Sequence, residues 1–230
     1  MKGKFIVFDG LDGSGKATQT KLLVDYLKTK KIKTEVVDFP QYQKTFFGNL
    51  VSRYLKGEFG GVNEVSPYLC ALTYSGDRWQ AKPKMEKTLK SGKILIANRY
   101  VSSNLAFMGA KIKLPKERER FFEWLQRLEY QIYGIPREDL LVYLSIPPKV
   151  GQRLVLNKGC RKYLGNKNKY DIHEANLKYL GKVQKIYLNL VKRFPHWRKI
   201  DCLDKQGKLM SKQEIHRLIV KILLKRKIVI

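Results

Sequence analysis

A glycine-rich loop between an apolar run and a helical segment limits most strongly how this chain can fold. The loop, residues 10–18, reads GLDGSGKAT and satisfies the Gly-x-x-x-x-Gly-Lys part of the phosphate-binding loop motif. Residues 4–9 before it are apolar and β-rich, and residues 17–28 after it carry apolar side chains at helical spacing. Because glycine N–H groups and a helix N-terminus both attract phosphate, this order predicts a strand, a phosphate-binding loop and a helix.

Each residue of this loop is expected to contact the phosphates of ATP or to shape the backbone around them. The predicted ATP-binding residues are Gly10, Leu11, Asp12, Gly13, Ser14, Gly15, Lys16, Ala17 and Thr18. The motif usually has Ser or Thr, a Mg²⁺ ligand, where this chain has Ala17, so we expect the adjacent Thr18 to carry part of that role. The loop alone does not distinguish a kinase from a helicase, a GTPase or a transport ATPase.

The rest of the chain alternates between strand-like and helix-like segments. Further strands are predicted at residues 34–39, 93–97, 140–146 and 196–202. Further helices are predicted at residues 48–55, 68–82, 116–133, 174–194 and 211–225. This alternation predicts an α/β fold whose parallel sheet is covered by helices on both faces. With no linker or repeat, residues 1–230 are predicted to form one domain, with a Lys-, Asn- and Gly-rich lid at about residues 151–172.

The net charge of the chain is unusually positive. The chain has 47 Lys and Arg residues against 20 Asp and Glu residues, a formal net charge of +27. Such a charge attracts phosphate-bearing partners of any kind, nucleic acid included, although lysines spread over helix faces are mostly solvated surface. No apolar stretch is long enough to span a membrane and no signal peptide is evident, so we expect a cytoplasmic protein without a membrane partner.

Four segments of the chain, in order, resemble the thymidylate kinase family. They are FDGLDGSGKATQT around the phosphate loop, FPQY at residues 39–42, LTYSGDRW at residues 72–79 and NRYVSSNLAFMG at residues 98–109. The resemblance implies a three-layer P-loop kinase fold with a five-stranded parallel sheet and a short lid. It also implies transfer of the γ-phosphoryl group of ATP to dTMP, Mg²⁺ as the metal, and a homodimer.

The resemblance assigns a set of residues to the dTMP-binding site. They are Asp12, Phe39, Pro40, Tyr42, Tyr74, Arg78, Arg99, Ser103, Asn104 and Phe107. Tyr74, where the family commonly has Phe, would stack on the base, and Arg78, four residues on and on the same helix face, would read it. Arg99 would hold the acceptor phosphate, and the bulk of Phe107 would disfavour a 2′-hydroxyl. With Asn104 beside the base, these residues favour a pyrimidine with a 4-keto group.

The catalytic and metal-binding residues implied by the resemblance surround the transferred phosphate. The catalytic set is Lys16, Arg99, Asp12 and Arg153. Asn98 stands where the family usually has Asp, which removes a carboxylate able to bind Mg²⁺ through water. Either Asp9 and Asp12 suffice in its place or catalysis is weakened. The residues predicted to bind the metal are Thr18 and Asp9.

The lid resembles the family more loosely. Its predicted functional residues are Arg153, Lys158, Arg161, Lys162, Asp171 and Glu174. Lids of this family present arginines to the transferring phosphate, and the sequence does not decide which of these cations does so here. His173, beside the last acidic residue, is expected at the surface or near a helix cap.

Two other functions stay open at this point. The first is a kinase for another deoxynucleoside monophosphate, with dUMP or dGMP as the competing acceptors. The second, from a different class, is a basic nucleic-acid-binding ATPase that kept the P-loop fold without kinase activity. The net charge, Ala17 and Asn98 motivate this second alternative.

Overall fold

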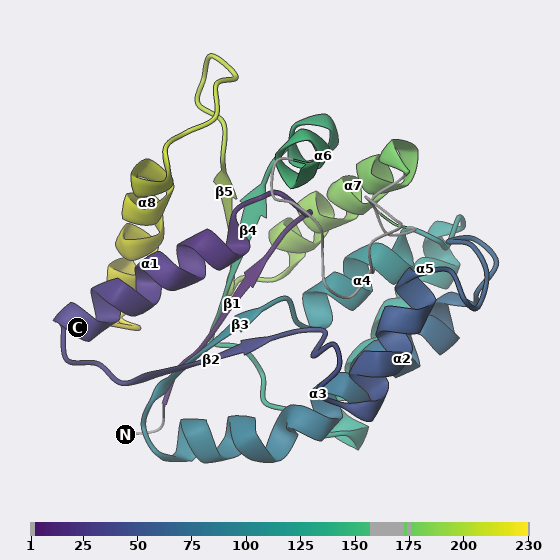
Figure 1. Ribbon diagram of the computed structural model, residues 1–230, viewed down its shortest axis with the longest axis horizontal. Helices are drawn as coiled ribbons and strands as arrows, with labels where there is room; N and C mark the ends of the chain where they lie inside the picture. The colour runs from purple at the N-terminus through teal and green to yellow at the C-terminus, as the bar shows by residue number, and fades with distance from the viewer. Residues whose placement is uncertain (1–2, 157–172, 174–175, 230) are drawn as a thin grey trace.

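A five-stranded parallel sheet forms the centre of the molecule in the computed structural model, which describes residues 3–156, 173 and 176–229 (Figure 1). The strands are β1 (Phe5–Asp9), β2 (Thr34–Asp38), β3 (Ile94–Asn98), β4 (Leu140–Ser145) and β5 (Trp197–Asp201). Their order across the sheet is β2-β3-β1-β4-β5, and every neighbouring pair is parallel. The predicted fold class and parallel five-stranded sheet are confirmed.

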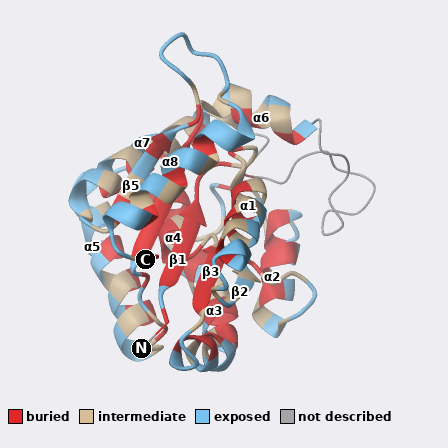
Figure 2. Cartoon of the chain, turned by 90° about the vertical axis from the view of Figure 1, so that its left-hand side faces the viewer, coloured by how far each residue is buried: buried red, intermediate tan, exposed pale blue. Residues whose placement is uncertain are grey.

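Helices cover both faces of this sheet. They are α1 (Lys16–Thr29), α2 (Phe46–Leu55), α3 (Pro67–Lys90), α4 (Val101–Gly109), α5 (Pro115–Gln126), the π-helical turn η1 (Arg127–Ile132), α6 (Pro148–Leu156), α7 (Leu177–Arg193) and α8 (Lys212–Lys225). On one face, Ile6 of β1 belongs to a buried cluster with Leu23 of α1 and Ile219 of α8. On the other, Phe5 of β1 shares a buried cluster with Tyr187 of α7. Figure 2 shows the buried strands between the buried sides of these helices, the predicted three-layer arrangement.

The sheet topology brings the functional segments to one edge. Phe8 of β1 lies opposite Asn98 of β3 on one side and Val142 of β4 on the other. The chain therefore leaves β1 toward β2 and β3 and later returns to the opposite side of β1. Ligands of parallel α/β sheets bind beyond the carboxyl ends of the strands at such a switch point. The phosphate loop leaves β1 at this point.

Two helices on the second face differ from the sequence-based expectation. α3 continues past Pro83 instead of ending near it, because Met85 and Leu89 beyond the proline are buried in the core. Residues 101–109 form α4, for which no helix was predicted. Its side chains are buried nearly all round, so no amphipathic period marks it in the sequence.

The predicted helix at residues 116–133 does not keep α-helical geometry to its end. After α5 the chain forms η1, in which the Tyr133 N–H donates to the Leu128 carbonyl oxygen, five residues back, at 2.8 Å. Such π-turns are rare and often occur at functional sites. This one contains a fully buried acidic residue, Glu129.

The first part of the predicted lid is helical. Residues 151–156, the start of the predicted lid, belong to α6, whose Gly151 and Val155 are buried. Residues 157–172 lie outside the described residues. None of the helices in the described residues is both long and apolar enough to cross a membrane.

Replacing Leu23 by Ala tests the core between α1 and the sheet. Leu23 is fully buried, and truncating a buried leucine lowers the free energy of unfolding by about 2–5 kcal/mol. We expect urea unfolding followed by circular dichroism to show a loss in this range. Lys21→Ala, at an exposed position of the same helix, is the control and should change the free energy of unfolding by less than about 0.5 kcal/mol. Equal effects of both substitutions would contradict this packing.

Candidate active site

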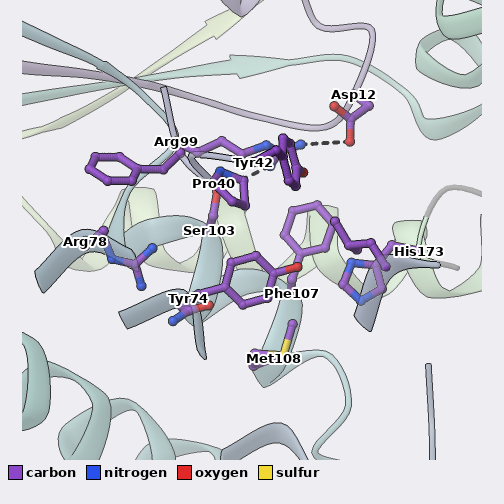
Figure 3. Close-up of a pocket in the computed structure, with 13 residues that line it drawn as sticks. Asp12, Pro40, Tyr42, Tyr74, Arg78, Arg99, Ser103, Phe107, Met108 and His173 are labelled. Atoms are coloured by element: carbon purple, nitrogen blue, oxygen red, sulfur yellow. Dashed lines mark hydrogen bonds and ion pairs between the residues drawn. The ribbon is translucent and has the colours of Figure 1, made fainter. Parts of the chain in front are cut away.

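A cavity of about 200 Å³ opens beside the phosphate loop at the carboxyl edge of the sheet. It is lined by Asp12, Phe39, Pro40, Tyr42, Leu55, Tyr74, Arg78, Arg99, Ser103, Asn104, Phe107, Met108 and His173. Every residue that the resemblance assigns to the dTMP-binding site therefore lies around one cavity. Leu55, Met108 and His173 line it as well. Figure 3 shows Asp12 and Arg78 at opposite ends of the group.

Arg99 is a fixed cation in the wall of this cavity. Its backbone has the left-handed conformation, φ 65°, where β3 turns into α4, and strained positions of this kind cluster at functional sites. Its guanidinium donates to Asp12 Oδ2 at 2.8 Å and to Ser103 Oγ at 3.3 Å (Figure 3). Burial by itself would lower the pKa of Arg99, but the carboxylates of Asp12 and Asp9 outweigh burial and raise this pKa well above its ordinary value.

Asp9, at the end of β1, anchors this arrangement from behind. It is fully buried, and its carboxylate accepts hydrogen bonds from the Gly10 N–H, the Ser103 hydroxyl and the Tyr187 hydroxyl, each at 2.8 Å. Nη1 of Arg99 lies 3.8 Å from Asp9 Oδ1. Oδ1 accepts these bonds and Oδ2 accepts from the Ser102 hydroxyl, so both oxygens are occupied by protein donors and Asp9 orients its neighbours. Its role as a metal ligand stays a prediction, and this geometry does not favour it.

The phosphate loop closes around the Lys16 side chain. Lys16 Nζ donates to the carbonyl oxygens of Gly10 and Leu11 at 3.0 Å each, and it lies 4.0 Å from Asp12 Oδ1. Ser14 Oγ is buried in the same loop and has no hydrogen-bond partner among the described residues. A buried hydroxyl without a partner is costly, and a phosphate oxygen would satisfy it.

Helix α6 packs tightly against this loop. Gly13 has a positive φ of 81°, and a Cβ atom there would lie 2.2 Å from the carbonyl oxygen of Gly151. A Cβ atom on Gly151 would in turn lie 2.6 Å from the carbonyl oxygen of Asp12. Only glycine allows the two backbones to approach this closely, so α6 and the loop form one unit.

Asn98 connects the helix after the loop with the neighbouring strand. Its Oδ1 accepts a hydrogen bond from Thr20 Oγ1 at 2.7 Å, and its Nδ2 donates to Asp38. Sequence reasoning missed Thr20 and Asp38, because their position depends on the register of β2 and β3, in which Asp38 lies opposite Asn98. Thr18 is half-buried in the first turn of α1, and its metal-binding role stays a prediction.

The far end of the cavity holds an arginine paired with a buried carboxylate. Arg78 is 1% exposed; its Nε donates to Glu129 Oε2 at 2.9 Å, and its Nη2 donates to Glu129 Oε1. Burial opposes the charge on Arg78, but attraction to Glu129 raises the pKa of Arg78 above its ordinary value. Asn104 Nδ2 donates to the Ala71 carbonyl oxygen at 3.1 Å, and Tyr74 lies half-buried on the same wall.

Sequence reasoning missed Glu129, although the sequence carries a signal for it. The buried side chains of Phe121, Leu125 and Leu128 mark the core-facing stripe of α5 and η1. Glu129 continues this stripe. A carboxylate on an apolar stripe must find a partner, because burying an unpaired charge is prohibitively costly. The sequence does not say which cation that partner is.

His173 lies near a helix cap, three residues before Asn176, the N-cap of α7, but the alternative expectation of a surface position is wrong. Its side chain is 4% exposed. The Tyr54 hydroxyl lies 3.0 Å from His173 Nε2, and the imidazole stacks on Phe107 with ring centroids 5.5 Å apart. Burial, together with the positive charges of Lys111 and Arg99, lowers the pKa of His173 to about 3. A neutral imidazole therefore forms part of the cavity wall.

The predicted lid residues are mostly beyond the described part of the chain. Arg153 lies exposed in the last turn of α6. The residues of the predicted lid set that lie outside the described residues are Lys158, Arg161, Lys162, Asp171 and Glu174.

The burial of His173 as a neutral imidazole should make the free energy of unfolding depend on pH. Its folded-state pKa is lowered, so the unfolded chain binds a proton below about pH 6.5 while the folded protein does not, and stability is lost as the pH falls. Between pH 7.5 and 5.5 this loss is about 1.4 kcal/mol. We measure the free energy of unfolding in urea at both pH values. On acidification, His173→Gln should lose about 1.4 kcal/mol less of it than the unmodified chain. An identical pH dependence in both proteins would contradict the burial of a neutral His173.

Comparison with known proteins places these features in a family. The family model for thymidylate kinase matches residues 8–215. The chain is 32% identical to a thymidylate kinase of Plasmodium falciparum over 99% of this chain and 92% of that protein. It is 33% identical to a probable thymidylate kinase of Thermococcus onnurineus over 94% of this chain and 95% of that protein. A solved structure of the thymidylate kinase of Candida albicans, 22% identical, superposes with a TM-score of 0.74 over 99% of this chain and 93% of that one. The chain belongs to the thymidylate kinase family.

Proposed function

We propose that this protein transfers the γ-phosphoryl group of ATP to dTMP, giving dTDP and ADP. The observation that carries this proposal is a single cavity that joins Arg99, beside the phosphate loop, to Tyr74, Arg78 and Asn104 at its other end. A nucleoside monophosphate has the same polarity, with an anion at one end and a flat base with a polar edge at the other. Membership of the thymidylate kinase family supports dTMP as that nucleotide.

Arg99 would hold the acceptor phosphate. The nucleophile is a phosphate oxygen that is already ionised near pH 7, so the reaction needs no dedicated general base. The main obstacle is repulsion between two anionic reactants, which a fixed cation offsets. The contacts of Arg99 with Asp12 and Ser103 hold the guanidinium in place before the substrate arrives. Catalysis would therefore rest on positioning and charge stabilisation.

Lys16 and the N–H groups of the loop would hold the phosphates of ATP. The Lys16 ammonium now contacts two neutral carbonyl oxygens at 3.0 Å each, and an ionised phosphate oxygen is a stronger acceptor. Arg153, on the helix that packs against this loop through Gly151, is the described lid cation that we propose to approach the transferring phosphate.

Mg²⁺ is the metal that we infer, because the donor atoms beside the loop fit it. The hydroxyl of Thr18 and the carboxylate of Asp12 are partly accessible oxygen ligands, the kind that Mg²⁺ prefers. In the described residues no three His, Cys, Asp or Glu side chains are placed to hold a metal together. This suits an ion that binds mainly to ATP phosphates and water. When bound, Mg²⁺ offsets the charge that develops on the phosphates.

The other end of the cavity would select the nucleoside. Tyr74 would stack on the base while Arg78 and Asn104 contact its polar edge, an arrangement that favours a pyrimidine with a 4-keto group. Phe107 would lie against the deoxyribose and disfavour a 2′-hydroxyl by bulk. The stacking of His173 on Phe107, with centroids 5.5 Å apart, holds this ring in place.

We also propose a homodimer, as the family resemblance implies. Leu69 and Trp79 of α3 and Ile132 of η1 support it, since these large apolar side chains are 60%, 49% and 65% exposed and a subunit contact would remove them from water. A cytoplasmic location stays a prediction. The prediction that nucleic acid is a minor partner, attracted by the net charge of +27, is likewise untested.

Arg99→Ala should lower kcat with ATP and dTMP by about 10²–10³, the usual effect of removing one charge-stabilising donor. A coupled assay of ADP release measures it. Lys90→Ala removes an exposed cation at the end of α3, away from the cavity, and should leave kcat unchanged. Full activity of Arg99→Ala would exclude the assigned role.

The choice of acceptor is tested by the same assay with dTMP, dUMP, dGMP, dCMP and AMP in turn, at moderate salt. We expect turnover with dTMP to exceed turnover with every other acceptor. Preference for dUMP or dGMP would favour the alternative of a kinase for another deoxynucleoside monophosphate. No turnover with any acceptor, together with salt-sensitive binding of an oligonucleotide, would favour the nucleic-acid-binding ATPase.

A further inference from the structure

We propose that Glu129 sets the base selectivity of this cavity by fixing the direction in which Arg78 and Asn104 present their hydrogen-bonding atoms. This inference rests on the proposed function and deepens it. Glu129 is fully buried and does not line the cavity. It is therefore a positioning residue, which acts on the nucleotide only through the two side chains that it holds.

The first of these side chains is Arg78. Both oxygens of Glu129 accept from it, Oε2 from Nε at 2.9 Å and Oε1 from Nη2. This fork occupies one edge of the guanidinium and turns the remaining N–H groups toward the Tyr100 carbonyl oxygen, 3.4 Å from Nη1, and the cavity that Arg78 lines. Because the carboxylate also cancels the charge, Arg78 meets a base as a directed donor rather than as a free cation.

The second side chain is Asn104. Its Nδ2 lies among three oxygen acceptors, the Ala71 carbonyl at 3.1 Å, Ser75 Oγ at 3.4 Å and Glu129 Oε1 at 3.5 Å. A rotation of the amide by half a turn would place its oxygen against these three oxygens. The amide is therefore held with its oxygen, an acceptor, on the side of the cavity.

Glu129 Oε1 links the two halves of this pattern. The Ser75 hydroxyl donates to it at 2.7 Å, and the same oxygen faces both Arg78 Nη2 and Asn104 Nδ2. The π-turn η1 carries Glu129 into this position, where the Ile135 N–H donates to the Glu129 carbonyl oxygen at 3.1 Å. Glu129 thus fixes the direction in which Arg78 donates and turns the acceptor oxygen of Asn104 toward the base end of the cavity.

This donor and acceptor pair distinguishes two pyrimidines. A 4-keto pyrimidine offers an oxygen acceptor beside an N–H donor, which matches the pair. Cytosine offers an amino donor beside a ring-nitrogen acceptor, so that donor would meet donor and acceptor would meet acceptor. A site built for one hydrogen-bonding pattern rejects the reverse strongly, because buried polar groups are left unpaired.

Glu129→Gln tests the inference, because glutamine keeps the size and removes the charge and one acceptor. The readout is the ratio of the dissociation constants of dCMP and dTMP, measured by titration calorimetry without ATP. We expect this ratio to fall by about tenfold or more, with KM for dTMP rising while kcat changes little. Glu138→Gln is the matched control. It neutralises another buried carboxylate, which binds Tyr130 at 2.9 Å and does not line the cavity, and it should keep the original ratio.

A folded Glu129→Gln protein that keeps the original ratio would overturn the inference. If this variant does not fold, Ser75→Ala tests the inference in its place. It removes the hydroxyl that donates to Glu129 and accepts from the amide of Asn104. A lower ratio then supports the inference and an unchanged ratio overturns it. An unmodified protein that binds dTMP and dCMP equally also overturns it, even with dTMP turnover. Preference for dTMP without turnover counts against the proposed kinase activity alone.

Discussion

The buried carboxylate of Asp9 is the interaction on which the rest of the site depends. It lies at the end of the central strand and binds the first glycine of the phosphate loop, α4 through Ser103 and α7 through Tyr187. The phosphate loop, α4 and α7 are thereby joined behind one cavity wall. The strained backbone of Arg99 is held by its own N–H, which donates to the Phe8 carbonyl oxygen at 2.8 Å, and by the side-chain contact with Asp12.

The cavity contains two arginines whose surroundings give them different chemistry. Arg99 pairs with Asp12, and these two side chains are 16% and 26% exposed. Arg78 faces Glu129, whose side chain is fully buried, and its charge is cancelled. The imidazole of His173 is neutral and adds no charge to the cavity wall. The two ends of the cavity therefore differ in how far their arginine–carboxylate pairs are exposed to a ligand.

The two departures from the family pattern differ in how the structure accommodates them. Asn98 takes a structural role, because its amide joins Thr20 of α1 to Asp38 of β2, contacts that need both a donor and an acceptor. Ala17 has no comparable substitute contact. Membership of the family, matched over residues 8–215 despite both changes, argues that neither has redirected the fold.

The sequence by itself determined the features that depend on short spacings, which are the strand, loop and helix around Lys16 and the alternation of strands with helices. The resemblance of its motifs to the thymidylate kinase family indicated residues that line the cavity, Tyr74 and Arg99 among them. Only the tertiary structure decided the positions and contacts of Glu129 and His173, the link from Asn98 to Asp38, and the π-turn η1. Those features depend on which distant side chains meet after the sheet register and helix packing are set. Local periodicity contains no information about such pairings. An apolar stripe shows that a charge on it is buried, but the packing of distant segments decides which side chain pairs with that charge.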